Sequence, residues 1–167
     1  MNDAATLDRG GFVTRYGGVF EHSPWIAEAA FDAGLAVPLT AERLHAQMVA
    51  AMRAGSAAQK QALIAAHPDL AGKLAQAGRL TAESSKEQAS AGLDALTDAE
   101  RARFTELNER YQARFGMPFI LAVKGRRKDE ILAAFERRLQ NDKDTEVDTA
   151  LAEIEKIALL RLKEMLP

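Results

Sequence analysis

Alanine and leucine far outnumber the β-branched aliphatic residues in this chain, and that imbalance limits the folds open to it. The 167 residues include 33 Ala and 19 Leu against 6 Val and 6 Ile. Ala and Leu favour helices, whereas Val and Ile are the aliphatic residues enriched in strands. A chain of this length is also the usual size of one domain. The composition therefore predicts an all-α protein, with a single compact domain over residues 1–167.

Residues that cap helix N-termini recur along the chain, and apolar residues at helical spacing follow them. Ser23 before Pro24 predicts one helix start, and Thr97 with Glu100 predicts a capping box. Pro68 stops the preceding helix, because it disfavours helical geometry in the residue before it. The helices predicted from these signals cover about 23–34, 40–55, 56–67, 97–116, a segment around 131–139, and 145–165. With the less regular stretches, about seven or eight helices are expected.

Three stretches between these helices are less regular: 67–72, 78–92 and 118–125. The last is short, apolar and bracketed by Pro118 and Gly125. A single strand would have no partner here, so we expect extended chain buried between helices. In the alternative, the chain is a non-enzymatic helical interaction module, and residues 118–123 of this stretch are its docking surface.

Charge and cysteine content exclude several function classes. The chain has 22 basic and 24 acidic side chains and no cysteine. A basic nucleic-acid footprint, disulfides, thiolate nucleophiles and Cys-ligated zinc are therefore not expected. The three histidines lack metal-ligand spacing, so no metal site is predicted. No apolar run is long enough to cross a membrane, and neither end resembles a signal or peroxisomal address, so a cytoplasmic protein is expected.

One arginine lies on the apolar face of the last predicted helix. Arg161 falls near the middle of a stripe of apolar residues at helical spacing. That stripe consists of Val147, Leu151, Ile154, Ala158 and Met165. A guanidinium in this position either reaches water past the helix end or meets a carboxylate or an anionic ligand. Both interpretations are open at this point.

His67 is the second candidate, because it lies at a predicted helix end and precedes a proline that restricts the local backbone. The negative end of a helix stabilises a protonated imidazole, which suits acid–base chemistry. The alternative is a histidine that caps the helix and takes part in no reaction.

The segment Ser84-Ser85-Lys86-Glu87-Gln88 is the third candidate. In a helix, Ser84, Glu87 and Gln88 share one face and offer a hydroxyl, a carboxylate and an amide. Ser-x-x-Glu is also a capping box that would start a helix ending at Gly92. The two interpretations are compatible, since a helix start presents backbone N–H groups to an anion.

Five segments in chain order, taken together, resemble one family. They are Phe20-Glu21-His22-Ser23-Pro24-Trp25, His67-Pro68-Asp69-Leu70-Ala71-Gly72, Ser84-x-x-Glu87-Gln88-x-x-Ala91-Gly92-Leu93-Asp94, Pro118-Phe119-Ile120-x-Ala122-Val123 and Arg161-Leu162. From about residue 7 to the C-terminus the chain resembles 2-oxo-4-hydroxy-4-carboxy-5-ureidoimidazoline (OHCU) decarboxylase. The resemblance implies an all-helical fold and the conversion of OHCU to (S)-allantoin, the last step of urate degradation. It also implies that the enzyme uses no metal or organic cofactor.

The resemblance also implies roles for individual residues. His67 matches the catalytic histidine, and the residues that match substrate-binding positions are Pro68, Ser84, Ser85, Lys86, Glu87, Gln88, Phe119, Ile120, Leu121, Ala122, Val123 and Arg161. The implied partners are the small ureidoimidazoline substrate and a second copy of the chain in a homodimer, with no nucleic acid or membrane. A ring-opening hydrolase acting on ureides is the nearest rival enzyme class.

Overall fold

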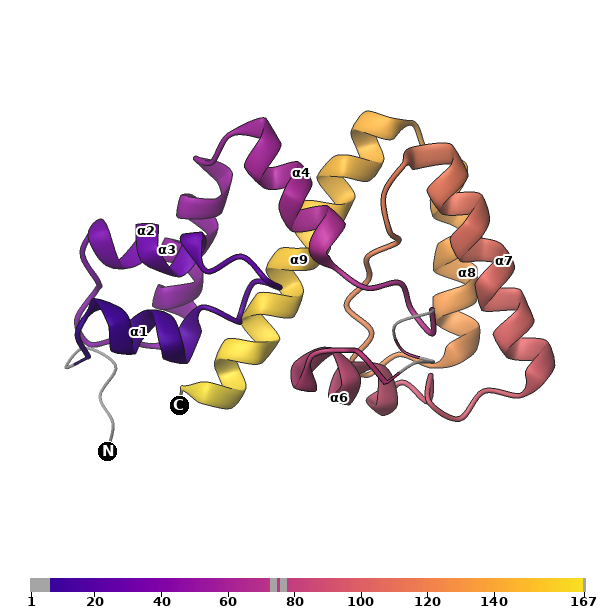
Figure 1. Ribbon diagram of the computed structural model, residues 1–167, viewed down its shortest axis with the longest axis horizontal. Helices are drawn as coiled ribbons and strands as arrows, with labels where there is room; N and C mark the ends of the chain where they lie inside the picture. The colour runs from indigo at the N-terminus through magenta and orange to yellow at the C-terminus, as the bar shows by residue number, and fades with distance from the viewer. Residues whose placement is uncertain (1–6, 73–74, 76–77, 167) are drawn as a thin grey trace. The chain divides into compact units, whose positions relative to one another are not determined.

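The computed structural model describes residues 7–72, 75 and 78–166 of the chain. Within these residues it contains eight helices and no strand (Figure 1). The helices are α1 (Arg9–Tyr16), α2 (Trp25–Asp32), α3 (Ala41–Arg53), α4 (Ala57–Ala66), α6 (Ala82–Ser90), α7 (Asp98–Phe115), α8 (Lys128–Arg138) and α9 (Lys143–Met165). The all-α class and the predicted number of helices are confirmed.

The chain divides into two compact units, and α9 contributes residues to both. The first unit consists of residues 1–66 and 154–167, and the second consists of residues 67–153. This division does not test the expectation of a single domain over residues 1–167, which stays a prediction. All predicted site residues belong to the second unit except Arg161, which belongs to the first.

The core of the first unit is built from the apolar faces of α1, α2 and α3. Leu44, Met48 and Met52 follow one another at four-residue spacing on α3 and are fully buried. α2 packs against both α1 and α3. Because four residues advance slightly more than one helical turn, this spacing keeps all three side chains on one face of α3.

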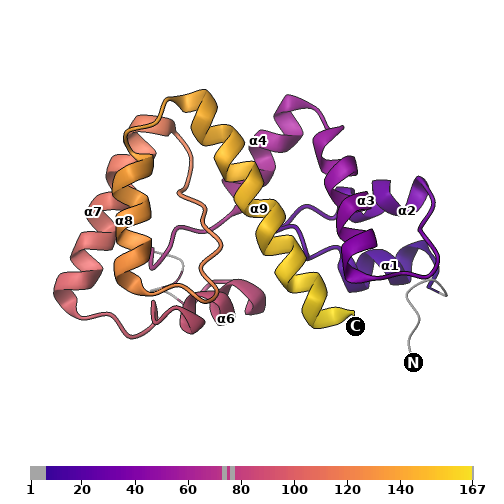
Figure 2. The same cartoon turned by 180° about the vertical axis from the view of Figure 1, so that it is seen from behind.

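Aromatic rings form the centre of the second unit. The ring of Phe119 stacks on that of Phe135 at a centroid distance of 3.7 Å, and Tyr111 meets Phe119 edge-on at 5.2 Å. α7 and α8, which carry Tyr111 and Phe135, lie alongside each other (Figure 1), and Figure 2 shows the pair from behind. The chain around Phe119 has no regular secondary structure and is buried against these helices, as predicted.

The predicted helix signals are confirmed for α7 and wrong for α2. Thr97 Oγ1 accepts from the Glu100 N–H at 3.1 Å, and Glu100 Oε1 accepts from the Thr97 N–H at 2.9 Å. Ser23 does not cap α2, because its hydroxyl donates to the Glu21 carbonyl at 3.0 Å. α2 therefore begins at Trp25, with Pro24 at its N-cap position.

Helix α1 was not predicted from the sequence. Its first turn contains Gly10 and Gly11, which disfavour helix formation. Asp8 offsets this by accepting the Gly11 N–H at 2.7 Å, and Phe12 and Tyr16 are fully buried on one face. Tertiary burial and a side-chain cap therefore outweigh the poor local propensity.

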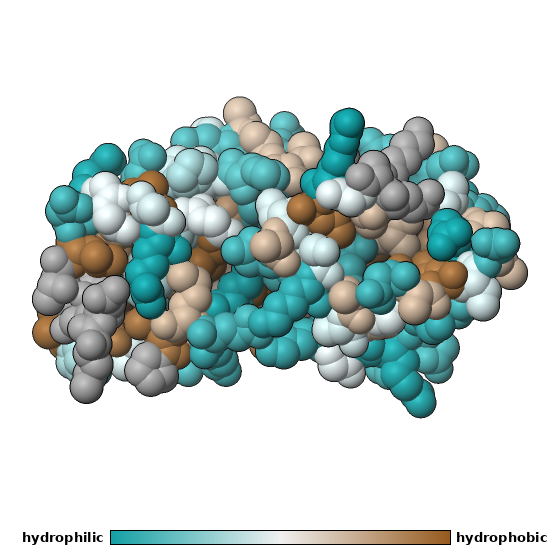
Figure 3. Space-filling model, turned by 60° about the horizontal axis from the view of Figure 1, so that its bottom comes forward, coloured by the Kyte–Doolittle hydropathy of each residue, from teal (hydrophilic) through white to brown (hydrophobic). Residues whose placement is uncertain are grey.

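Hydrophilic and hydrophobic side chains are interspersed on the face of the molecule shown in Figure 3. Among the described residues, Val37 is the one large hydrophobic residue that is exposed, at 78%. Phe119 to Val123 are buried. This apolar stretch therefore packs inside its unit and does not form the docking surface considered above. None of the described helices is both long and apolar enough to cross a membrane.

Candidate active site

His67 begins an irregular segment directly after α4. The helix ends at Ala66, as the position of Pro68 predicts. The His67 side chain is buried, with 7% of its surface exposed. We call residues 67–72, which have no regular secondary structure, the His67 loop. A buried imidazole in such a loop takes its orientation from the groups that hold the loop in place.

The second half of the His67 loop has a conformation that few sequences adopt. Ala71 has φ +52°, in the left-handed region that L residues other than glycine rarely enter. A Cβ atom on Gly72 would lie 2.6 Å from the Cβ of Asp69, so only glycine fits there without a shift. Burial raises the pKa of the Asp69 carboxyl. The loop is thus folded tightly on itself and contains a half-buried carboxyl.

Helix α6 carries the segment 84–88 and begins earlier than the predicted capping box. Thr81 is the N-cap, and its hydroxyl accepts from the Ser84 N–H at 3.2 Å. The alternative in which Ser84 caps the helix is therefore wrong, and Ser84 lies inside the first turn. Ser84 and Gln88 are buried, Glu87 is half-buried, and Ser85 and Lys86 are exposed.

The Gln88 side chain joins α6 to the His67 loop. Its Oε1 accepts from the Ala71 N–H at 2.8 Å, and its Nε2 donates to the Asp69 carbonyl at 3.2 Å. The structure therefore brings together two of the predicted segments, the His67 loop and α6, within one unit. Sequence reasoning proposed Gln88 as a substrate contact and did not anticipate this role.

Arg138 contacts residues 119 and 120 of the segment that was predicted to bind substrate. Its Nη1 donates to the Ile120 carbonyl at 2.5 Å, and its guanidinium lies 4.4 Å from the Phe119 ring centroid. Its Nε donates to Glu146 Oε1 at 2.9 Å, and both side chains are buried. Tyr111 donates its hydroxyl to the same carboxylate oxygen at 2.5 Å. Burial and this hydrogen bond raise the pKa of Tyr111 above its usual range.

This network of Arg138, Glu146 and Tyr111 was missed by sequence reasoning. One signal was present, because Arg138 shares a helix face with the apolar residues Ile131 and Phe135. A charged residue on an apolar face needs a buried partner, but the helical pattern does not say which carboxylate supplies it.

Arg161 meets a carboxylate in the first unit. Its Nη2 lies 2.9 Å from Oε2 of Glu21, and the two side chains are 6% and 2% exposed. Its Nη1 is 3.3 Å from the carbonyl oxygens of Gly18 and Val19. The alternative in which Arg161 reaches water past the helix end is therefore wrong. Glu21 was quoted within the family resemblance, but its partnership with Arg161 was not predicted.

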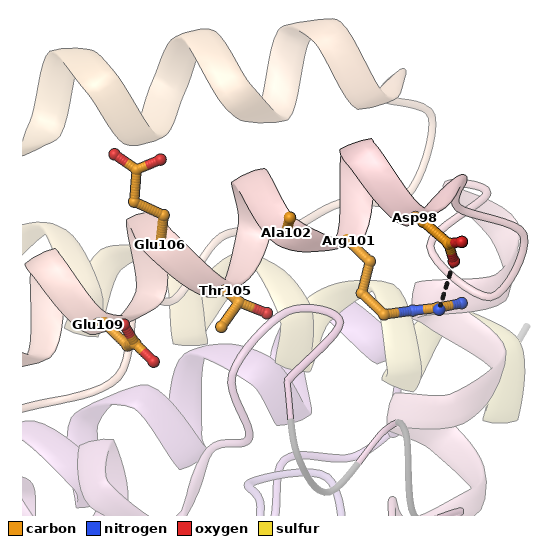
Figure 4. A pocket seen from close by; sticks show the side chains of 6 residues that line it. All are labelled: Asp98, Arg101, Ala102, Thr105, Glu106 and Glu109. Atoms are coloured by element: carbon orange, nitrogen blue, oxygen red, sulfur yellow. Dashed lines mark hydrogen bonds and ion pairs between the residues drawn. The ribbon is translucent and has the colours of Figure 1, made fainter.

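Described residues of the second unit line two cavities that bear on the site. The larger, of about 430 Å³, is a groove along α7 whose walls include the Asp98–Arg101 pair (Figure 4). All of its lining residues come from this one helix, and none was predicted for the site. The smaller, of about 260 Å³, is lined in part by Ala71, Ser85 and Gln88. Of these two cavities, the one near the His67 loop and α6 contains the predicted site residues Ser85 and Gln88.

No cluster of three or more metal-ligating side chains occurs in the part of the chain that the structure describes. Ser84, Glu87 and His67 offer hydrogen-bonding and proton-transfer groups within one unit. These groups suit the binding of a small polar molecule and acid–base chemistry on it.

Comparison with known proteins identifies relatives along nearly the whole chain. The OHCU decarboxylase family model matches residues 5–163. The 2-oxo-4-hydroxy-4-carboxy-5-ureidoimidazoline decarboxylase of Haloferax volcanii is 42% identical over 159 residues, which are 95% of this chain and 90% of the relative. The mouse protein of the same name is 38% identical and covers 96% of this chain and 89% of its own length.

Solved structures agree with these relatives. A crystal structure of (S)-allantoin synthase matches with a TM-score of 0.79 and 34% identity over 98% of this chain, which spans 53% of that protein. A crystal structure of OHCU decarboxylase in the presence of (S)-allantoin matches with a TM-score of 0.65 at 22% identity, over 84% of this chain and 89% of the other, and supports the fold alone. The chain therefore belongs to the OHCU decarboxylase family.

Proposed function

We propose that this protein catalyses the decarboxylation of OHCU to (S)-allantoin, the last step of urate degradation, without a cofactor. The observation that carries the proposal is the family match over residues 5–163, which includes every predicted site residue. Curated relatives at 42% and 38% identity are named for this reaction. The buried His67, in a loop that Gln88 joins to the polar helix α6, is consistent with it.

The substrate itself can accept the electrons that decarboxylation releases. The bond between the ring carbon and the carboxylate breaks and CO₂ leaves. The electron pair forms a double bond to the carbon that bears the ureido group, and the nitrogen of the neighbouring imine takes up a proton. The carbon that bears the ureido group is then protonated on one face, and the hydroxyl loses its proton to become the carbonyl of allantoin. The protein must orient the scissile bond and deliver a proton from one side.

We assign these tasks to the predicted residues. His67 contacts the hydroxyl and carboxylate of the substrate and acts as the acid or base. Arg161 and the start of α6 around Ser84 anchor the anionic and carbonyl oxygens through charge-assisted hydrogen bonds. Glu87 binds the ureido and ring N–H groups, and Gln88 remains a predicted contact of the same kind.

The test generates OHCU from urate with the two upstream enzymes, adds this protein, and follows circular dichroism together with CO₂ release. Faster formation of (S)-allantoin with one CO₂ per turnover is expected. Slow decay to racemic allantoin at the uncatalysed rate would contradict the proposal and favour a non-enzymatic module. Consumption of the ureide without CO₂ release would identify a ring-opening hydrolase.

The absence of a cofactor from the proposed reaction can be tested separately. Dialysis against a chelator, followed by gel filtration to remove small molecules, leaves kcat unchanged. A loss of activity that returns with one added metal ion would contradict this part of the proposal. A cytoplasmic location and a homodimer stay predictions, to be checked by cell fractionation and sedimentation equilibrium.

A further inference from the structure

Two side-chain amides hold the backbone of the His67 loop from different helices. The Gln88 amide, from α6, contacts two peptide groups of the loop, as described above. From α7, Asn108 Nδ2 donates to the carbonyl oxygen of Leu70 at 2.9 Å. Backbone polar groups of three consecutive loop residues are thus hydrogen-bonded to side chains. In a helix or a sheet, such groups would bond to other backbone groups.

Asn108 is an unusual residue for its position. It lies on the apolar face of α7 between Phe104 and Tyr111, and 7% of its surface is exposed. Its Oδ1 is buried and has no hydrogen-bond partner among the described residues. An unpaired buried acceptor is unfavourable, and an apolar side chain of similar shape would avoid it. Asparagine differs from such an apolar side chain by its Nδ2 donor, and that donor binds the loop.

The loop needs these contacts to keep its shape. Ala71 occupies the left-handed region, and Gly72 is pressed against Asp69. Such a backbone persists where its surroundings hold it in place. Because His67 begins the loop, a change in the loop backbone moves the imidazole. A displacement of about 1 Å at a reacting group can lower a rate by about a hundredfold.

We propose that Asn108, acting with Gln88, is a positioning residue that orients His67 through the loop backbone. The catalytic part of this inference rests on the proposed function of His67. Asn108 touches no reacting atom in this scheme. It acts by pairing the Leu70 carbonyl, and so it sets the direction of the imidazole.

The test uses N108L and Q88M, which keep approximate side-chain shape and remove the hydrogen bonds from α7 and α6 separately. The chain has three histidines, so ring signals in a long-range ¹H–¹⁵N NMR spectrum are easily separated. In both variants we expect the His67 signals to shift, while those of His22 and His45 in the first unit stay in place. With OHCU, kcat of N108L should fall about 10–100-fold while its KM changes less than about threefold. Because Gln88 is also a predicted substrate contact, Q88M is judged by its His67 signals alone.

Q112L is the matched control, because Gln112 is exposed on the same helix, about one turn beyond Asn108. Its spectrum and kcat should equal those of the unsubstituted protein. Unchanged His67 signals in a folded N108L or Q88M would overturn the proposal, as would loss of folding in both. If the unsubstituted protein does not convert OHCU, the proposed function fails, and the histidine spectra alone decide whether the amides orient His67.

Discussion

The guanidinium of Arg161 and the carboxylate of Glu21 form a buried ion pair in the first unit, with 2.9 Å between Nη2 and Oε2. The other terminal nitrogen, Nη1, donates hydrogen bonds to the backbone carbonyls of Gly18 and Val19. The arginine that we expect to anchor the substrate is therefore fixed by its own unit. Such a pair orients the guanidinium in advance, so that less freedom is lost when an anion binds.

Removal of Glu21 should destabilise the protein strongly. In E21A the buried guanidinium loses its counter-charge, and breaking a buried pair in this way costs about 3–5 kcal/mol. E21Q should cost less, because the amide oxygen still accepts a hydrogen bond. Urea denaturation at pH 7, monitored by far-UV circular dichroism, measures both free energies of unfolding.

A double-mutant cycle with R161M separates the pair from other effects of the substitutions. The loss in E21A/R161M should be smaller than the sum of the two single losses, because the double variant leaves no unpaired buried charge. Additive losses would show that the contact between Glu21 and Arg161 carries no coupling energy.

Substitution of His67 should abolish most of the activity while the protein stays folded. General acid–base catalysis contributes about 10²–10⁴-fold to a rate, so kcat of H67N should fall by at least about a hundredfold. The control is H45Q, because His45 contacts the Glu155 carbonyl in the first unit at 2.8 Å and has no part in the proposed reaction. Near-normal turnover by H67N would remove His67 from the mechanism.

Local signals predicted most of the helices, since they depend on residues close together in the chain. The capping box of Thr97 and Glu100 is one example, and the end of α4 before Pro68 is another. α1 was not predicted, because its two glycines oppose helix formation. The burial of Phe12 offsets their effect only in the folded chain.

The residues of the candidate site stay a prediction from the sequence, and the side chains that hold them in place could not be predicted. Arg161 stood out as a charge on an apolar face, and Asn108 occupies such a face on α7 in the same way. The helical pattern around either residue does not say which group it bonds to. Glu21 lies 140 positions before Arg161, and Leu70 lies 38 before Asn108, so only the folded chain pairs them.

Replacement of Tyr111 by phenylalanine should weaken the second unit. Y111F removes the 2.5 Å hydrogen bond to the buried Glu146 carboxylate, a change that costs about 1–3 kcal/mol. The side chain keeps its ring contact with Phe119, so packing is little altered. Urea denaturation at pH 7 gives the loss, and a value near zero would mean that Glu146 finds another donor.

The same variant should change how stability depends on alkaline pH. The pKa of Tyr111 is raised in the folded protein, so above about pH 10 the unfolded chain loses this proton first. The unfolded state then binds fewer protons than the folded one, and stability falls as pH rises. Y111F should lack this part of the fall. Y16F, which alters the chain's other tyrosine, should keep it.

Asp69 should destabilise the protein at neutral pH, and D69N should remove that effect. Burial raises the pKa of this carboxyl in the folded protein above the ordinary value of 3.8. As pH rises past 3.8, the unfolded chain releases the proton while the folded protein retains it, so the free energy of unfolding decreases until the folded carboxyl also ionises. The melting temperature of D69N should therefore exceed that of the unsubstituted protein at pH 7, and the difference should shrink toward pH 3.5.

An exposed carboxylate, Asp98 on α7, supplies the control, because D98N should show no such gain at pH 7. A lower melting temperature for D69N at pH 7 would mean that the ionised Asp69 stabilises the loop, contrary to the effect of its burial.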